Sequence, residues 1–187
     1  MDGRVVLQQK LEHWCAASVR ALSNQPSVHF RGHHLMLKEQ PFILQAPYLQ
    51  LDFSTRNTAK LRGIADSVAL RLVHSDLDAH SEHLPDSIIE KIIFEQLEQF
   101  RCESLTPDNL PGMRTNMRAR FLFWADQAAA SSLVENSIGL LLFTINMVSW
   151  SRLHALAIPE QIEELIEEDF AEDAARGGQV VNLDERR

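Results

Sequence analysis

The stretch RGIADSVALRLVHSDLDAH, residues 62–80, places charged and imidazole side chains on a segment with helical periodicity. These side chains are Arg62, Asp66, Arg71, His74 and His80. Apolar residues recur beside them at the spacing of a helix with one buried face, at Leu61, Ile64, Ala65, Val68 and Leu72. Carboxylate, guanidinium and imidazole groups this close together have two uses. They move protons or bind a metal ion, or they pair with one another and fix the register of packed helices.

A second polar group lies on the segment 87–105, where Arg101 falls inside an apolar stripe and Glu98 borders that stripe one turn earlier. A guanidinium in an apolar sector is costly unless a carboxylate meets it, so Asp66 and Glu98 are its candidate partners. We expect Asp66 and Arg101 to meet across a helix interface, with Glu98 and His74 completing the network. The pattern therefore favours an interhelical ion-pair network over a catalytic site.

Two groups of histidines offer a metal-binding alternative. His80 and His83 share a helix face, and His29, His33 and His34 cluster at a predicted hairpin turn. The sequence contains neither the Glu-x-x-His pair of di-iron bundles nor the His-Glu-x-x-His zinc motif. Solvated polar side chains explain both groups more simply, and a metal site stays the alternative.

The elements that must position these residues are mostly helical. Apolar periodicity predicts helices over 5–23, 56–74, 87–105, 112–130 and 132–156, a helical turn over 78–84, and an acidic helix after Pro159. Residues 27–45 are rich in β-formers around an Arg31-Gly32 turn and predict a short hairpin. The predicted fold class is all-α, a helical bundle of about five to six helices with a small β-hairpin insertion near residues 27–45. We expect a helical N-terminal domain at 1–158, then an acidic helix and the disordered start of a linker at 159–187.

Composition limits the possible partners. The net charge is −8, but ten acidic and three basic residues follow Pro159, so the preceding body is nearly neutral and nucleic acid is not an expected partner. Two cysteines in helical segments fit reduced thiols, and no apolar run reaches the ~20 residues of a membrane span, so we expect a cytoplasmic chain with no membrane partner. No glycine-rich phosphate loop and no Gly-x-Ser-x-Gly elbow occurs.

Two segments of the sequence contain an ordered series of charged and small residues. The first is RGIADSVALRLVHSD at 62–76, followed by His80, and the second is FEQLEQFRCESLTPDNLPGMRTNMRARF at 94–121. The ordered positions are Arg62, Gly63, Ala65, Asp66, Ala69, Leu70, Arg71, His74, Asp76, His80, Phe94, Leu97, Glu98, Gln99, Arg101, Glu103, Pro111, Gly112 and Asn116. This order resembles the N-terminal region of the T subunit of aerobic cobaltochelatase, the CobT family. The resemblance spans most of residues 10–156, because AASVRALS and SIGLLLFTINMVSWSRL are also similar in kind.

The resemblance implies a part in a machine rather than an active site. Members of the family work in aerobic cobalamin biosynthesis with an AAA+ ATPase subunit and a large corrin-binding subunit, which inserts cobalt into a corrin. The T subunit normally continues through an acidic linker into a von Willebrand factor A domain. We expect that domain to be missing here, because the nearest approach to its Asp-x-Ser-x-Ser metal motif, residues 52–56, has Arg56 in place of the second serine.

Two functional hypotheses follow. The first is a non-catalytic assembly domain that docks to the ATPase, to the missing C-terminal domain or to a second copy of itself; it has no cofactor of its own, and the assembled complex handles cobalt and Mg-ATP. Its structural or interaction network would comprise Arg62, Asp66, Arg71, His74, Glu98, Arg101, Glu103 and Asn116. The second is a protein that handles cobalt or zinc through His29, His33, His34, His80 and His83.

Overall fold

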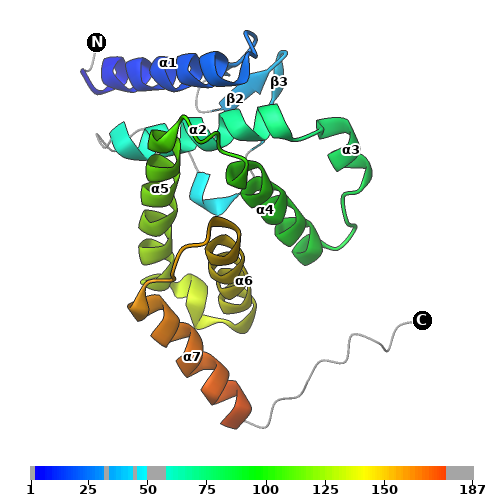
Figure 1. The fold of residues 1–187 in the computed structure, drawn as a ribbon, viewed down its shortest axis with the longest axis vertical. Helices are drawn as coiled ribbons and strands as arrows, with labels where there is room; N and C mark the ends of the chain where they lie inside the picture. The colour runs from blue at the N-terminus through cyan, green and yellow to red at the C-terminus, as the bar shows by residue number, and fades with distance from the viewer. Residues whose placement is uncertain (1–2, 32–33, 44–45, 50–57, 176–187) are drawn as a thin grey trace.

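The computed structural model describes residues 3–31, 34–43, 46–49 and 58–175. Within these ranges the chain forms seven α-helices, two short 3-10 helices and three short strands (Figure 1). The α-helices are α1 (Gly3–Ser23), α2 (Thr58–His74), α3 (Leu77–Glu82), α4 (Ile88–Ser104), α5 (Pro111–Ala129), α6 (Ser137–His154) and α7 (Glu160–Ala175). The 3-10 helices are η1 (Pro47–Leu49) and η2 (Ser132–Glu135), and the strands are β1 (His29–Arg31), β2 (His34–Leu37) and β3 (Gln40–Pro41). The predicted mostly helical fold with a small hairpin is confirmed.

The predicted single helix over 132–156 is wrong, because the structure divides it into η2 and α6. Asn136 separates the two, since its side-chain oxygen accepts a hydrogen bond from the Gly139 backbone nitrogen at 2.8 Å and caps α6. A Cβ atom at Gly139 would collide with the Leu133 carbonyl oxygen of η2. Local capping therefore overrides apolar periodicity, and α6 begins at Ser137 instead of at residue 132.

Helix α2 is the centre of the body. It packs against α1, α4 and α5, and Figure 1 shows α4 and α5 running away from it on the side opposite to α1. Gly63 lets α2 and α5 approach closely, since a Cβ there would lie 2.5 Å from the Asn116 carbonyl oxygen and 2.7 Å from Arg120 Cβ. One of the small residues in the first motif is thus explained by backbone packing.

The strands form an antiparallel sheet in the order β1-β2-β3 beside α1. Phe30 opposes Leu35 in the first pair, and Met36 opposes Pro41 in the second. Lys38 and Glu39 form the tight turn between β2 and β3 with φ values of 49° and 65°, and Glu39 accepts a hydrogen bond from Arg31 at 2.8 Å. The predicted Arg31-Gly32 turn lies partly outside the described residues.

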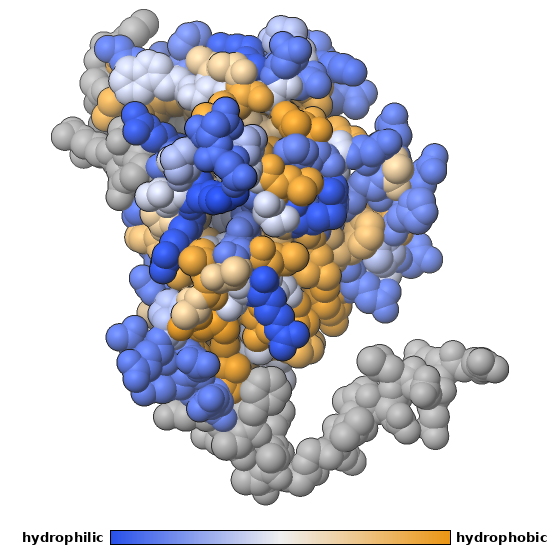
Figure 2. Space-filling model, viewed as in Figure 1, coloured by the Kyte–Doolittle hydropathy of each residue, from blue (hydrophilic) through white to orange (hydrophobic). Residues whose placement is uncertain are grey.

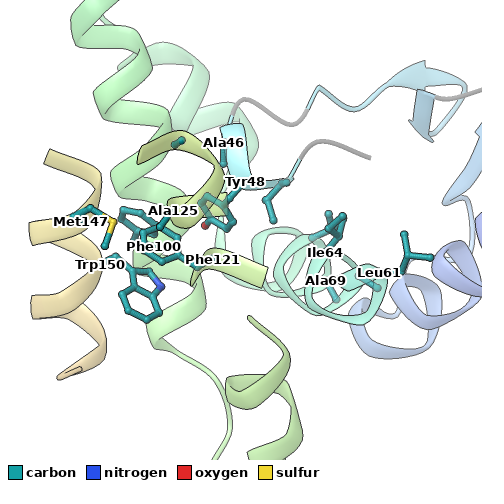
Figure 3. Close-up of a cluster of buried hydrophobic side chains, with 14 of the residues drawn as sticks. Ala46, Tyr48, Leu61, Ile64, Ala69, Phe100, Phe121, Ala125, Met147 and Trp150 are labelled. Atoms are coloured by element: carbon teal, nitrogen blue, oxygen red, sulfur yellow. The ribbon is translucent and has the colours of Figure 1, made fainter. Parts of the chain in front are cut away.

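The core is aromatic where α4, α5 and α6 meet. Figure 3 shows Trp150 of α6 beside Phe121 of α5, with Phe100 of α4 and Tyr48 of η1 next to them. The rings of Phe121 and Trp150 stack with centroids 4.3 Å apart, and Tyr48 meets the edge of Phe121 at 5.3 Å. All four side chains are buried, so η1 inserts its tyrosine into a core made by distant helices.

Helix α7 packs onto this core through Ile162 and Ile166, which are both buried. Residues 176–187 of the segment 159–187, which was predicted to hold an acidic helix and the start of a linker, lie outside the described residues, and the domain boundary at 158 stays a prediction. Among the helices of the described ranges, none is long and apolar enough to cross a membrane.

Candidate functional site

A polar stripe on α4 organises the candidate site. Glu95, Gln99 and Glu103 follow one another at intervals of one helical turn and face inward, with Gln99 and Glu103 buried. Gln99 Nε2 donates to the Ser67 carbonyl oxygen at 3.1 Å and to Glu103 Oε1 at 3.0 Å, which joins α4 to α2. The stripe separates two polar clusters, one at each end.

The first cluster, the Arg71–Glu95–His80 triad, joins α2, α3 and α4. Arg71 Nη2 lies 3.0 Å from Glu95 Oε2, and His80 Nε2 lies 3.1 Å from the same oxygen. The side chains of Arg71, Glu95 and His80 are only 7%, 15% and 10% exposed. Both nitrogens converge on one carboxylate oxygen, which compensates the buried negative charge.

His80 owes its position to local structure. Asp76 caps α3 by accepting from the backbone nitrogens of Asp78 and Ala79, and the His80 ring then stacks on Phe94 with centroids 4.6 Å apart. His80 Nε2 lies 3.1 Å from Glu95 Oε2 and 3.0 Å from Arg71 Nη2, so all three polar groups of the triad are in contact with one another. The polar groups of the triad therefore find their partners within the triad.

The second cluster surrounds Glu103, whose side chain is 0% exposed. Tyr48 Oη donates to Glu103 Oε1 at 2.7 Å, and Glu103 Oε2 lies 3.9 Å from His154 Nε2. Burial raises the pKa of Glu103, and the hydrogen bonds from Tyr48 and Gln99 offset part of that rise. Burial and the nearby Arg114 charge lower the pKa of His154, so this imidazole is a poor counter-ion. Glu103 is thus a buried acid held by neutral donors.

Asp66 occupies the interface of α2 with α5. Its Oδ2 accepts from Asn116 Nδ2 at 2.8 Å, and the side chain is buried. Burial raises the pKa of Asp66, while Asn116 and the Arg62 charge act in the opposite direction. Burial and the Asp66 charge together raise the pKa of Cys15 to about 12, so this thiol stays protonated at neutral pH.

The predicted contact between Asp66 and Arg101 is wrong. Arg101 is 48% exposed and binds Glu98 in its own helix, through Nε to Oε2 at 2.6 Å and Nη2 to Oε1 at 2.8 Å. Its Nη2 also donates to the His74 carbonyl oxygen at 2.7 Å, so the backbone of His74 is the partner. The last carbonyls of a helix lack intrahelical donors, and a guanidinium at the C-terminus of α2 satisfies one.

The Arg101 contacts control the ionisation of Glu98. Burial would raise the pKa of this carboxyl, but the hydrogen bonds and charge of Arg101, together with Ser75 and the Arg71 charge, outweigh it and lower the pKa to about 2. Burial and the neighbouring Glu98 charge raise the pKa of Cys102 to about 12. The second cysteine is therefore as unreactive as the first.

The structure separates the histidines proposed as metal ligands. His29 Nδ1 faces the Ser27 carbonyl oxygen, His83 Nδ1 faces the Ala79 carbonyl oxygen, and His80 belongs to the triad. His34 is exposed on β2, and His33 lies outside the described residues. Among the described residues, no group of three or more His, Cys, Asp or Glu side chains is placed to hold a metal ion.

Sequence reasoning missed three members of the clusters. Glu95 could have been found from the sequence, because Glu95, Gln99 and Glu103 recur every four residues and therefore share one helix face. Tyr48 and His154 have no such signal, because they approach Glu103 from positions 55 and 51 residues away along the chain.

The chain was compared with known proteins. A family model described as cobalamin biosynthesis protein CobT matches residues 8–183. No curated protein and no solved structure matches the chain. The matched region includes both motifs and every cluster described above, and the chain belongs to the CobT family of cobalamin biosynthesis proteins.

Proposed function

We propose that this chain is a non-catalytic assembly domain of a multisubunit cobaltochelatase in the cytoplasm. In this proposal an AAA+ ATPase subunit hydrolyses Mg-ATP, a large corrin-binding subunit carries the corrin, and cobalt is the metal substrate. The domain supplies a rigid body that connects partners, and the reacting groups belong to the other subunits.

The Arg71–Glu95–His80 triad carries this proposal. A proton-transfer or metal site needs a polar atom that is available to the reactant or the metal ion. In the triad, the Arg71 guanidinium and the His80 imidazole both contact the Glu95 carboxylate. Asp66 is likewise bound by Asn116, and Glu98 by Arg101. These motif residues serve contacts between or within helices, which supports a structural role.

An apolar surface on α4 and α6 is available for a partner. We call it the α4/α6 face and define it by Ile88, Ile89, Ile92, Ile138 and Leu141. The side chains of Ile88, Ile138 and Leu141 are 77%, 56% and 50% exposed. Figure 2 shows apolar surface gathered over the region of α4 and α6. Large exposed apolar patches mark protein contacts, and this proposal assigns the face to the ATPase subunit.

The test is reconstitution of the chain with the AAA+ ATPase subunit and the corrin-binding subunit. Because truncating a central apolar contact removes a large part of binding energy, Leu141→Ser should weaken ATPase binding by about tenfold or more and reduce cobalt insertion. Its matched control is Ile43→Ser, since Ile43 is 71% exposed but lies after β3, outside the α4/α6 face.

Both variants should keep the far-ultraviolet circular dichroism and melting temperature of the parent. Cobalt insertion at full rate in the absence of this chain would contradict the assembly role. Equal ATPase affinities for Leu141→Ser and Ile43→Ser would remove the α4/α6 face from the proposal.

A further inference from the structure

A cavity of about 360 Å³ lies where the end of α4, the first half of α5 and the end of α6 meet. Its wall includes Glu103, Arg114, Met117, Arg118, Trp150 and His154. A water molecule occupies about 30 Å³ in the liquid, so the space is large enough for a small organic molecule. The cavity lies beside the second cluster and away from the triad.

Three buried polar atoms on this wall have no hydrogen-bond partner among the residues that the structure describes. They are Glu103 Oε2, His154 Nε2 and Trp150 Nε1, and each exposes less than 1 Å². Buried polar atoms in folded proteins are nearly always paired, so three orphans on one cavity wall require an explanation. A bound group that pairs with them supplies one.

Two arginines provide positive charge at the same cavity. Arg114 is 55% exposed and binds Asp108 at 2.7 Å and the Thr106 carbonyl oxygen at 3.0 Å. Arg118 is exposed one turn further along α5 and has no ion-pair partner among the residues that the structure describes. The outer part of the cavity therefore favours an anionic group.

The orphan atoms define the chemistry of the inner group. Trp150 Nε1 only donates, so the bound group must accept, whereas an ionised Glu103 Oε2 only accepts, so the group must also donate. An ammonium group has no acceptor for Trp150, and a carboxylate has no donor for Glu103. A primary carboxamide has both, because its oxygen accepts and its nitrogen carries two hydrogens.

We propose that this cavity binds a small carboxamide that also bears an anionic group. The carboxamide pairs with Glu103, His154 and Trp150, and the anionic group faces Arg114 and Arg118. Because the three orphan atoms are enclosed, the amide reaches them when His154 turns aside. In this proposal the movement is confined to the His154 side chain, which ends α6 beside Ala155 (φ 52°) and is 13% exposed.

The proposal is tested on the full chain with four five-carbon probes that share one carboxylate: glutaramate, glutarate, δ-aminovalerate and δ-hydroxyvalerate. Binding is followed by NMR through the Trp150 indole resonance, which is assigned with Trp150→Phe. Glutaramate should bind about tenfold tighter than glutarate and δ-aminovalerate, because each of those leaves a buried group unpaired. A preference for δ-hydroxyvalerate over glutaramate would overturn the carboxamide assignment, and no saturable shift with any probe would overturn the site.

Two variants separate the inner group from the outer one. Glu103→Gln keeps the side-chain shape and, with its oxygen still facing Tyr48 and Gln99, turns an amide nitrogen toward the cavity. It should reverse the preference, so that glutarate binds better than glutaramate. Arg118→Gln should weaken all four probes by several fold while leaving the glutaramate-to-glutarate ratio unchanged.

The matched control is Arg152→Gln, because Arg152 is an exposed arginine of α6 that does not line the cavity. It should bind every probe as the parent does. Equal effects of Arg118→Gln and Arg152→Gln would show a non-specific charge effect and overturn the site. If Glu103→Gln does not fold, the probe series and Arg118→Gln still decide the matter.

Discussion

Glu95 and Glu103 are two buried carboxylates on the same face of α4, eight residues and about 12 Å apart along the helix. Glu95 meets a guanidinium and an imidazole that converge on one oxygen. Glu103 meets a phenol, an amide and a histidine whose pKa is lowered, and one of its oxygens has no partner. The first arrangement is complete and clamps three helices, whereas the second is incomplete and lies on a cavity. Burial is common to both acids, and the difference between them is whether their oxygens have partners among the described residues.

The largest expected effect comes from breaking the complete cluster. Arg71→Met removes the guanidinium and leaves Glu95 enclosed with His80, so we expect the free energy of unfolding to fall by about 3 to 5 kcal/mol. Urea denaturation measures the loss. The control is the double variant Arg71→Met, Glu95→Met, which should recover much of the stability because no buried charge is left uncompensated. A loss well under 1 kcal/mol in the single variant would contradict the clamp.

A smaller loss is expected at the incomplete cluster. Tyr48→Phe removes the hydroxyl that donates to Glu103 Oε1 and leaves Gln99 as the donor, which should cost about 1 to 3 kcal/mol. The same change in a Glu103→Gln background should cost less, since an amide oxygen needs its donor less than a carboxylate does. Equal costs in the two backgrounds, measured by urea denaturation, would show that the hydroxyl does not act through Glu103.

The pH dependence of stability sharpens the comparison further. Burial raises the folded-state pKa of Glu103 above its ordinary value of 4.5. The contribution of Glu103 to the free energy of unfolding is therefore lost as the pH rises from 4.5 through the folded-state pKa. Burial lowers the pKa of His154 below 6.5, so its contribution is lost as the pH falls from 6.5 through the folded-state value. Relative to the parent, Glu103→Gln should become more stable with rising pH above 4.5, and His154→Gln with falling pH below 6.5. Urea denaturation across about pH 4 to 8 measures both, and parallel pH profiles for the parent and both variants would refute the assigned shifts.

The smallest effect is expected at the Arg101–Glu98 pair, in which the guanidinium is 48% exposed although the carboxylate is only 14% exposed. Arg101→Gln should raise the pKa of Glu98 above its value of about 2, because burial remains and only the Ser75 hydrogen bond and the Arg71 charge still oppose it. The change in stability at neutral pH should be no more than about 1 kcal/mol, since Arg101 is half exposed. NMR titration of the Glu98 side chain measures the pKa. A value that stays near 2 would show that other donors control this carboxyl.

Part of the candidate site could be predicted from the sequence. The motif residues Arg71, His80, Glu103 and Asn116 were selected, and the structure places the first two in the triad, Glu103 in the second cluster and Asn116 on Asp66. Of the two candidate partners of Arg101, Glu98 is the one that the structure shows, whereas Asp66 is wrong, because a position in an apolar sector of α4 does not mean that the side chain is buried. Arg101 lies instead at the end of α2, where it is 48% exposed and donates to the His74 carbonyl oxygen.

The sequence by itself determined the elements, because helix periodicity, caps and breakers act over a few neighbouring residues. Asn136 is an exception, because its side chain caps α6 and the helix begins later than the apolar pattern predicts. This cap is itself a local feature of the sequence. The partners of the buried acids were decided only by tertiary structure. A helical pattern fixes which face is apolar but not the rotation, depth or neighbour of that face, which depend on contacts such as Gly63 against the backbone of α5. The packing of α2, α4, α5 and α6 places the Glu95 carboxylate against Arg71 and the Glu103 carboxylate beside a cavity. Local sequence rules do not contain that information.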